Sequence, residues 1–228
     1  MKYHIIGDIH GRGAWKLLID NNAVNIFIGD YFDSYDDLPF EVLKNNFLEI
    51  INFKHEHPDN VILLYGNHDF HYMSRCNERY SRYSEKNAME IWGLLTDNRD
   101  CFHGIAYNIG ENYIVTHAGI SQEWAKMYLP DTDKKPSVMS AAINQLWFDN
   151  PNNFSFNFNS LPGDFFGESS THSPIWIRPK ALISNNLYKH SSVKQIVGHT
   201  QSPKIEEVNG IIFTDCLGTC TDCAKIET

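Results

Sequence analysis

Three short apolar segments in the first third of the chain each run into a glycine and then a polar residue. They cover residues 2–6, 24–28 and 61–65. Each is about as long as a buried strand, and a glycine turn after such a run is typical of a strand end. Residues 13–20 and 39–56 lie between them and carry apolar positions at helical spacing. This alternation predicts a parallel sheet with right-handed crossovers, whose loops gather beyond the carboxyl ends of the strands.

The remainder of the chain contains shorter elements. Apolar runs predict strands at residues 113–115, 195–197, 204–208 and 211–214. The last two are joined around Asn209-Gly210, which is typical of a hairpin. Helical spacing recurs at residues 121–128 and 137–146. Residues 149–174 have no clear period, and we expect an irregular insertion near the site within a single domain spanning residues 1–228.

Five short motifs follow the apolar runs. They are Gly7-Asp8-Ile9-His10-Gly11, Gly29-Asp30-Tyr31-Phe32-Asp33, Gly66-Asn67-His68-Asp69, Thr116-His117-Ala118-Gly119 and Gly198-His199-Thr200. Glycine permits a sharp turn that places the next side chain at the strand end. Carboxylate, imidazole and amide oxygen together suit divalent ions such as manganese, iron or zinc, and the absence of cysteine from the five motifs argues against a structural thiolate zinc site.

In this order the five motifs resemble the calcineurin-like metallophosphoesterase superfamily, specifically its phosphoprotein-phosphatase-like branch with bacterial and phage members. The resemblance covers roughly residues 2–218. It implies an α/β (α+β sandwich) fold with two mixed β-sheets packed face to face and flanked by helices. It also implies a dinuclear metal site at the carboxyl-terminal edge of the sheets.

The same resemblance implies a role for each metal-site residue. It places Asp8 and His10 on a first metal, Asp30 between two metals, and Asn67, His117 and His199 on the second. The residue types agree, because a carboxylate is a natural bridge between cations and two metals roughly 3.5–4 Å apart can activate one shared water. We expect two divalent ions as cofactors, with manganese favoured over iron or zinc.

Three further residues are expected to take part in the reaction. His68 would protonate the leaving oxygen, and Asp33 would orient the His68 ring. Arg178 lies in the segment 174–179, which looks like the Trp-x-Arg segment of bacterial family members. Its guanidinium would hold two phosphate oxygens, and Asn67 would also contact the substrate.

The second motif departs from the family pattern. The phosphatase branch usually carries a phosphate-binding arginine directly after its second aspartate, but here Ser34 follows Asp33. Three explanations stay open: Arg178 serves alone, an arginine from Arg75, Arg79 or Arg82 substitutes, or the phosphate is held differently. The departure leaves the substrate class open while the metal chemistry is unaffected.

The charge composition of the chain restricts the classes of substrate that we expect. The chain has 19 Lys and Arg against 28 Asp and Glu, a formal net charge of −9. Such a surface repels nucleic acid overall, so we expect a small phosphorylated molecule, a nucleotide or a phosphoprotein as substrate and no long nucleic acid. The sequence has neither a signal-peptide pattern nor a run of roughly 18 apolar residues, which favours the cytoplasm and no membrane contact. The oligomeric state is open.

Several residues permit two interpretations. Cys216, Cys220 and Cys223 suggest zinc, but a closed site needs four ligands, so a strand and turn with free thiols is favoured. His71 and His172 lie near motifs without a clear role. The aromatic residues of the irregular insertion could grip a nucleobase or a peptide side chain, or could simply pack it; they are Phe154, Phe156, Phe158, Phe165 and Phe166.

Three functions follow from these patterns. The favoured one is hydrolysis of phosphate monoesters, in the manner of a serine/threonine phosphatase. The alternatives are a dinucleoside polyphosphate hydrolase or a phosphodiesterase acting on nucleotide or RNA ends, and a metal-binding scaffold without turnover. The scaffold is disfavoured because the expected ligands and His68 are all present.

Overall fold

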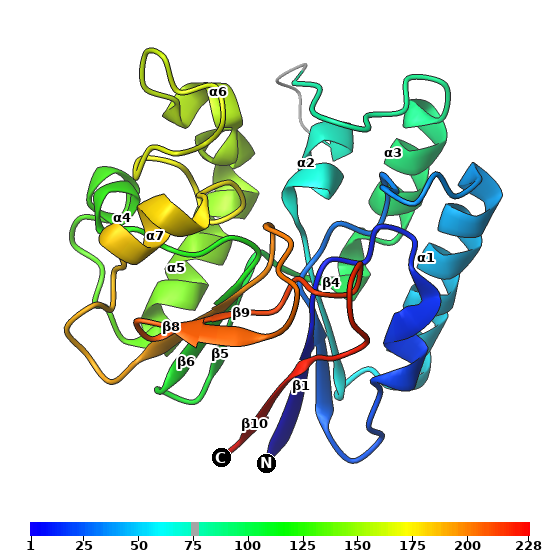
Figure 1. Cartoon of the computed structure of the whole chain (residues 1–228), viewed down its shortest axis with the longest axis horizontal. Helices are drawn as coiled ribbons and strands as arrows, with labels where there is room; N and C mark the ends of the chain where they lie inside the picture. The colour runs from blue at the N-terminus through cyan, green and yellow to red at the C-terminus, as the bar shows by residue number, and fades with distance from the viewer. Residues whose placement is uncertain (74–77) are drawn as a thin grey trace.

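The computed structural model describes residues 1–73 and 78–228, apart from the side chain of Phe158. Two five-stranded sheets lie at the centre (Figure 1). The first contains, in order, β10 (Ala224–Glu227), β1 (Lys2–Ile6), β2 (Val24–Phe27), β3 (Val61–Leu64) and β4 (Phe102–Gly104). The second contains β5 (Ala106–Ile109), β6 (Tyr113–Thr116), β7 (Lys194–Val197), β9 (Ile211–Phe213) and β8 (Glu206–Val208). This is the expected sandwich of two mixed sheets.

Parallel pairing dominates where the motifs lie. In the first sheet β1, β2, β3 and β4 are parallel, and in the second β6, β7 and β9 are parallel. The strands β10, β5 and β8 pair antiparallel at the edges. Because parallel strands share an edge for their carboxyl ends, the five motif turns are brought to the same side of the molecule.

Helices cover the outer faces of the sandwich. Figure 1 shows α1 (Phe40–Glu56) and α3 (Ala88–Asp97) on the side of the first sheet, with α2 (Asn67–Met73) above its strands. The second sheet is flanked by α4 (Gln122–Tyr128), α5 (Pro136–Asp149), α6 (Phe156–Asn159) and α7 (Pro179–Ser184). The helical spacing seen along residues 39–56 is confirmed, since Leu43, Phe47, Ile50 and Ile51 are buried on one face of α1.

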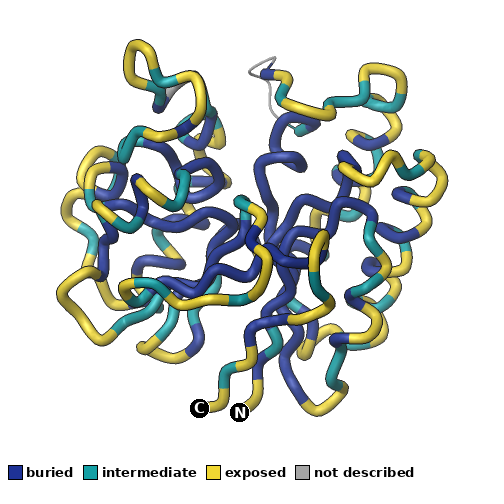
Figure 2. The backbone as a smooth tube through the Cα atoms, viewed as in Figure 1, coloured by how far each residue is buried: buried dark blue, intermediate teal, exposed yellow. Residues whose placement is uncertain are grey.

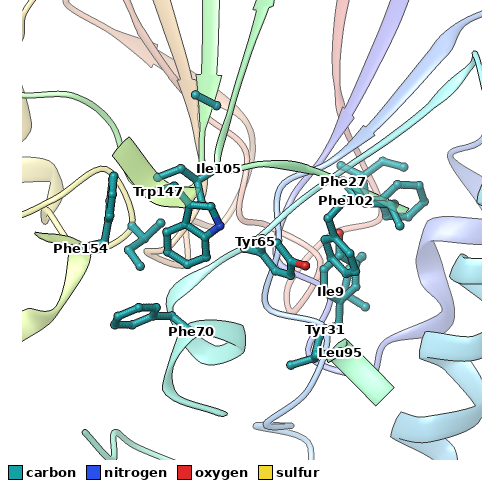
Figure 3. Close-up of a cluster of buried hydrophobic side chains, with 14 of the residues drawn as sticks. Ile9, Phe27, Tyr31, Tyr65, Phe70, Leu95, Phe102, Ile105, Trp147 and Phe154 are labelled. Atoms are coloured by element: carbon teal, nitrogen blue, oxygen red, sulfur yellow. The ribbon is translucent and has the colours of Figure 1, made fainter. Parts of the chain in front are cut away.

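The core is rich in aromatic rings. Figure 3 shows a buried cluster in which Tyr65 lies between Phe102 and Trp147. The Tyr65 and Phe102 rings stack with centroids 4.0 Å apart, and Trp147 lies 5.6 Å from Tyr65. A second apolar cluster, including Ile26, Ile196 and Ile212, joins the facing sheets. Figure 2 shows the buried chain continuing from the sheets into the turns above them.

Several elements differ from the sequence expectation. Residues 13–20 form only a short 3-10 helix, Gly13–Leu17, in place of the predicted helix. The strands β4, β5 and β10 and the helices α2 and α3 carried no sequence prediction. The hairpin of β8 and β9 is confirmed. Residues 149–174 contain the short 3-10 helix Pro151–Phe154 and the four-residue α6, and are otherwise irregular.

The chain ends lie side by side, at the free ends of β1 and β10 (Figure 1). The backbone N–H of Thr228 donates to the carbonyl of Met1 at 3.0 Å. Within the described residues, no helix has the length and apolar character needed to cross a membrane.

Candidate metal centre

The five motif turns meet where the two sheets adjoin. Asp8 follows β1, Asp30 follows β2, Asn67 begins α2 directly after β3, His117 follows β6 and His199 follows β7. Most of these side chains are almost inaccessible: Asp8, Asp30 and Asn67 are each 1% exposed, and His117 is fully buried. All six residues singled out as metal ligands in the sequence are therefore brought together.

A first group of donor atoms comes from Asp8, His10 and Asp30, whose ligand atoms all lie within 4.8 Å of one another. The Nε2 atom of His10 lies 3.6 Å from Oδ2 of Asp30 and 4.0 Å from Oδ2 of Asp8. Two ligands of one ion at about 2.1 Å are roughly 3–4 Å apart, so this spacing suits a shared divalent ion.

A second group comes from Asn67, His117 and His199. The amide Oδ1 of Asn67 lies 2.8 Å from Nε2 of His117 and 2.9 Å from Nδ1 of His199. The same Nε2 of His117 lies 3.4 Å from Oδ2 of Asp30. The Asp30 Oδ2 atom therefore lies within reach of both groups, which is the position expected of a bridging carboxylate.

The histidine rings are oriented by groups outside the centre. The Nδ1 atoms of His10 and His117 lie 3.0 Å and 2.8 Å from the carbonyl oxygens of Phe32 and Ile28. A carbonyl can only accept, so each Nδ1 carries the proton and each Nε2 turns a lone pair inward, an arrangement typical of metal-binding histidines. The Nε2 atom of His199 is buried and has no hydrogen-bond partner among the described residues.

The turns that carry these side chains are strained and closely packed. His10, Asp30 and His199 have φ angles of 44°, 57° and 65°, a region that residues other than glycine rarely adopt. A Cβ atom on Gly66 would lie 2.2 Å from Oδ1 of Asp30, and one on Gly198 would lie 2.2 Å from Oδ1 of Asp8. Glycine is required at both positions because the donor carboxylates approach the backbone directly.

The electrostatics show an excess of buried negative charge. Burial, together with the neighbouring Asp30, raises the pKa of Asp8. Burial and the charges of Asp8 and Asp30 raise the pKa of Asp215, which lines the same cavity. Burial lowers the pKa of His10 to about 4, so that its ring is neutral. Burial lowers the pKa of His199 as well, whereas the charges of Asp30 and Asp8 raise the pKa of His117 to about 10 despite its burial. The carboxylates therefore favour a positive charge beside them, which a bound cation would supply in place of the His117 proton.

His68 and Asp33 lie beside these donor groups. The Nδ1 atom of His68 donates to Oδ2 of Asp33 at 2.8 Å, and its backbone N–H donates to Oδ1 of Asp30 at 2.8 Å. The Asp33 carboxylate also accepts from the Tyr72 hydroxyl and lies 2.6 Å from Nε2 of His71. His71, which had no clear role in the sequence, thus shares with His68 the carboxylate that orients it.

A cavity of about 200 Å³ opens onto the centre and contains two arginines. Arg178 donates from Nη1 to Oγ1 of Thr200 at 3.1 Å. Arg12 donates from Nε to Oδ2 of Asp36 at 2.7 Å. Sequence reasoning missed Arg12, although it directly follows the first motif. Among the alternatives considered, Arg79 and Arg82 pair with Glu85 and Asp37 and are not among the described residues lining this cavity, and Arg75 lies outside the described residues.

Residues 1–203 match the family of calcineurin-like phosphoesterases. The chain belongs to this family. It is accordingly a metallophosphoesterase, a hydrolase that acts on phosphate ester bonds, and the donor groups described above lie where five of its strands end.

Solved structures share the fold of this phosphoesterase. A cold-active protein-tyrosine phosphatase of a psychrophilic Shewanella species aligns with a TM-score of 0.60 and 17% identity, covering 94% of this chain and 70% of that one. A protein serine/threonine phosphatase from Saccharomyces cerevisiae aligns with a TM-score of 0.55 and 16% identity, covering 96% of this chain and 70% of that one. At these identities the likeness concerns the fold.

Three of the described cysteines lie near the carboxyl end of the chain. Cys216 and Cys223 are buried, Cys220 is half-buried, and all three are free thiols. Burial and a hydrogen bond with Cys220 raise the pKa of the Cys216 thiol to about 12, which disfavours the thiolate that zinc requires. No close group of three metal-ligand atoms found among the described residues includes a cysteine.

Proposed function

We propose that this phosphoesterase hydrolyses phosphate monoesters at two divalent ions held by Asp8, His10, Asp30, Asn67, His117 and His199. The observation that carries the proposal is the position of Asp30 Oδ2, which lies 3.6 Å from Nε2 of His10 and 3.4 Å from Nε2 of His117. One carboxylate oxygen thus faces both donor groups. The mixture of nitrogen and oxygen donors suits manganese, with iron or zinc as alternatives.

Bound at these positions, the ions would supply an activated water and neutralise charge on the phosphoryl oxygens. The surrounding residues would retain the ions and orient their ligands. Asp8 and Asp30 contribute the negative charge that retains the cations, and the carbonyls of Phe32 and Ile28 keep the rings of His10 and His117 turned inward.

His68 is placed to act as the general acid. Its Nδ1–H is held by Asp33 at 2.8 Å, which directs Nε2 toward the cavity, where it lies 3.4 Å from the Tyr35 hydroxyl. A proton on Nε2 can therefore be given to the oxygen of the departing alcohol. Asp33 acts as a positioning residue, because its contact is with the ring and not with the substrate.

Two guanidinium groups favour a monoester over a diester. Arg12 and Arg178 both line the cavity, and a phosphate monoester brings a dianion where a diester brings a single charge. Arg12 thereby takes the place of the arginine that the second motif lacks. The fold neighbours are, by their names, phosphatases of phosphotyrosine and of phosphoserine or phosphothreonine, which agrees with monoester chemistry.

The test compares three phosphate compounds. Metal-stripped protein is incubated with Mn²⁺ and para-nitrophenyl phosphate, its bis ester or a dinucleoside polyphosphate, beside Asp30→Asn and His68→Asn. His103→Asn serves as a matched control, since His103 is exposed and does not line the cavity above the centre. We expect turnover that depends on added metal, prefers the monoester and is lost in both site variants only. Preference for the polyphosphate or the bis ester would replace the monoesterase assignment, and metal binding without any turnover would favour the scaffold.

A further inference from the structure

A second cavity adjoins the one above the metal centre. Its volume is about 650 Å³, within the range of about 300–1,000 Å³ that is typical of pockets for small molecules. Ser81, Trp176 and Arg178 line both cavities. We call the second cavity the aromatic groove. A phosphate ester whose phosphoryl group reaches the first cavity would therefore place its remaining part at the entrance of this groove.

The inner wall of the aromatic groove is built from packed rings. Tyr80 meets the edge of Trp176 with centroids 4.2 Å apart, and Phe156 meets the same ring at 5.1 Å. Trp176 is only 5% exposed and lies 5.6 Å from the ring of His199. This indole therefore separates the metal centre from the groove, and its position is fixed from both sides.

The outer rim carries two phenylalanines that are unusually open to solvent. Phe165 and Phe166 are 79% and 76% exposed, whereas Phe154 of the same insertion is fully buried between Trp124 and Trp147. Exposed apolar side chains gathered at a cavity mark a binding surface. The sequence left open whether these aromatic residues pack the insertion or bind a ligand. In the structure Phe154 packs in the core, whereas Phe165 and Phe166 are free to contact a ligand.

The exposed pair is presented by an anchored turn. The Asp164 carboxylate accepts backbone N–H bonds from Gly167, Glu168 and Ser169 at 2.7–2.9 Å. It also lies 2.9 Å from Nε2 of the fully buried His172. Arg178 in turn donates from Nε to the carbonyl oxygen of Phe166 at 3.3 Å. The rim is thus tied both to the interior of the insertion and to an arginine of the catalytic cavity.

We propose that the aromatic groove binds an aromatic ring in the leaving group of the phosphate ester. The inference rests on the proposed monoesterase activity and narrows its substrate class. Rings on the floor and rim provide stacking and edge contacts for a flat apolar group. Two cationic residues, Arg178 and Lys180, line the groove, and Glu168 is the one acidic residue among its described lining residues. The positive charge of this lining favours a ligand that carries phosphate. The ring belongs either to an aryl ester or to a nucleoside.

The test measures kcat/KM by phosphate release with Mn²⁺ for phenyl phosphate, adenosine 5′-monophosphate and glycerol phosphate, which has no ring. The wild type is compared with the double variant Phe165→Ser/Phe166→Ser. Phe148→Ser is the matched control, because Phe148 is 64% exposed on α5 and does not line the groove. We expect the double variant to lose about 3-fold to 10-fold on at least one ring-bearing substrate and to be unchanged on glycerol phosphate.

The pattern of losses separates the possible ligands. A loss on phenyl phosphate alone assigns the groove to aryl esters, and a loss on the nucleotide alone assigns it to nucleosides. If the double variant has the same kcat/KM as the wild type on each of the three substrates, the inference is overturned and the monoesterase proposal stands. Absence of turnover on every ester contradicts the monoesterase.

A binding measurement tests the groove independently of turnover. By titration calorimetry with Mn²⁺ present, the wild type should bind phenylphosphonate more tightly than methylphosphonate. The double variant should lose that preference, and the control variant should keep it. Equal preference in all three proteins would overturn the inference.

Discussion

The metal centre and the aromatic groove share Trp176 and Arg178, yet they are built in opposite ways. The centre is assembled from five strand ends in two sheets, and its donors are buried. The groove is lined mainly by residues 156–180, and its rim phenylalanines are exposed. The proposed metal ligands thus lie at buried strand ends, where substitutions are least tolerated. The rim phenylalanines that would contact the leaving group lie on a segment that holds none of the proposed metal ligands.

Backbone geometry shows the same contrast. At the centre, residues such as Asp30 and His199 hold positive φ angles next to glycines that tolerate no added carbon. Such strain persists only where the surrounding structure imposes it. In the groove, the turn at Asp164 is held by side-chain hydrogen bonds, which a substitution can weaken gradually. We therefore expect steep losses from changes at the centre and graded losses from changes around the groove.

The largest effect is expected for Asp30→Asn. The variant replaces the one carboxylate that faces both donor groups by a neutral amide, so turnover should fall by at least about 100-fold. Steady-state kinetics with saturating Mn²⁺ measures the loss. Circular dichroism should show a folded chain, and Asp97→Asn on α3 is the matched control. Near-normal turnover in Asp30→Asn would remove the basis for a bridged pair of ions.

The next effect is expected for Gly198→Ala. Its new Cβ would lie 2.2 Å from Oδ1 of Asp8, so the carboxylate must move and Mn²⁺ affinity should fall by about 10-fold to 100-fold. Equilibrium dialysis measures this affinity. Gly93→Ala is the control, because nothing lies within 4 Å of a Cβ there and alanine should stabilise α3 by about 1 kcal/mol. Equal affinities in both variants would contradict the close packing of the centre.

A further effect, on kcat/KM, is expected for the two arginines that line the cavity above the centre. Arg12→Ala and Arg178→Ala should each lower kcat/KM by roughly 10-fold to 100-fold, since a hydrogen bond to a charged group contributes about 1.5–3 kcal/mol. Kinetics on para-nitrophenyl phosphate gives the values. Arg79→Ala, at an exposed ion pair, should leave them unchanged. An effect of Arg178→Ala without one of Arg12→Ala would mean that Arg178 holds the phosphate alone.

The smallest effect concerns pH and the support of the groove. Burial lowers the pKa of His172 from its usual 6.5, despite the neighbouring Asp164. The unfolded chain therefore takes up this proton at a higher pH than the folded chain does, so stability should fall as pH drops below about 6.5. The urea-unfolding free energy should drop less between pH 7.5 and pH 5 in His172→Gln than in the wild type. An equal drop would show that His172 contributes nothing to acid sensitivity.

The sequence predicted the centre better than its surroundings. The six proposed ligands could be grouped because each lies just after an apolar run, and parallel strands bring such turns to one edge. Arg12 could not be placed, since its position depends on Asp36, 24 residues away. Helix α2 was missed because the residues from Asn67 onward are polar and aromatic without an apolar stripe, and the edge strand β10 is too short to show a period. Nothing in the order of the phenylalanines separates Phe154, in the core, from Phe166, on the rim.

The central claim is that Asp30 joins two neighbouring metal positions. The most direct test is an anomalous-difference map from crystals of the protein grown with Mn²⁺. We expect two peaks, one contacted by Asp8, His10 and Asp30 and the other by Asp30, Asn67, His117 and His199. A single peak, or a peak held by Asp33, His68 and His71, would contradict it.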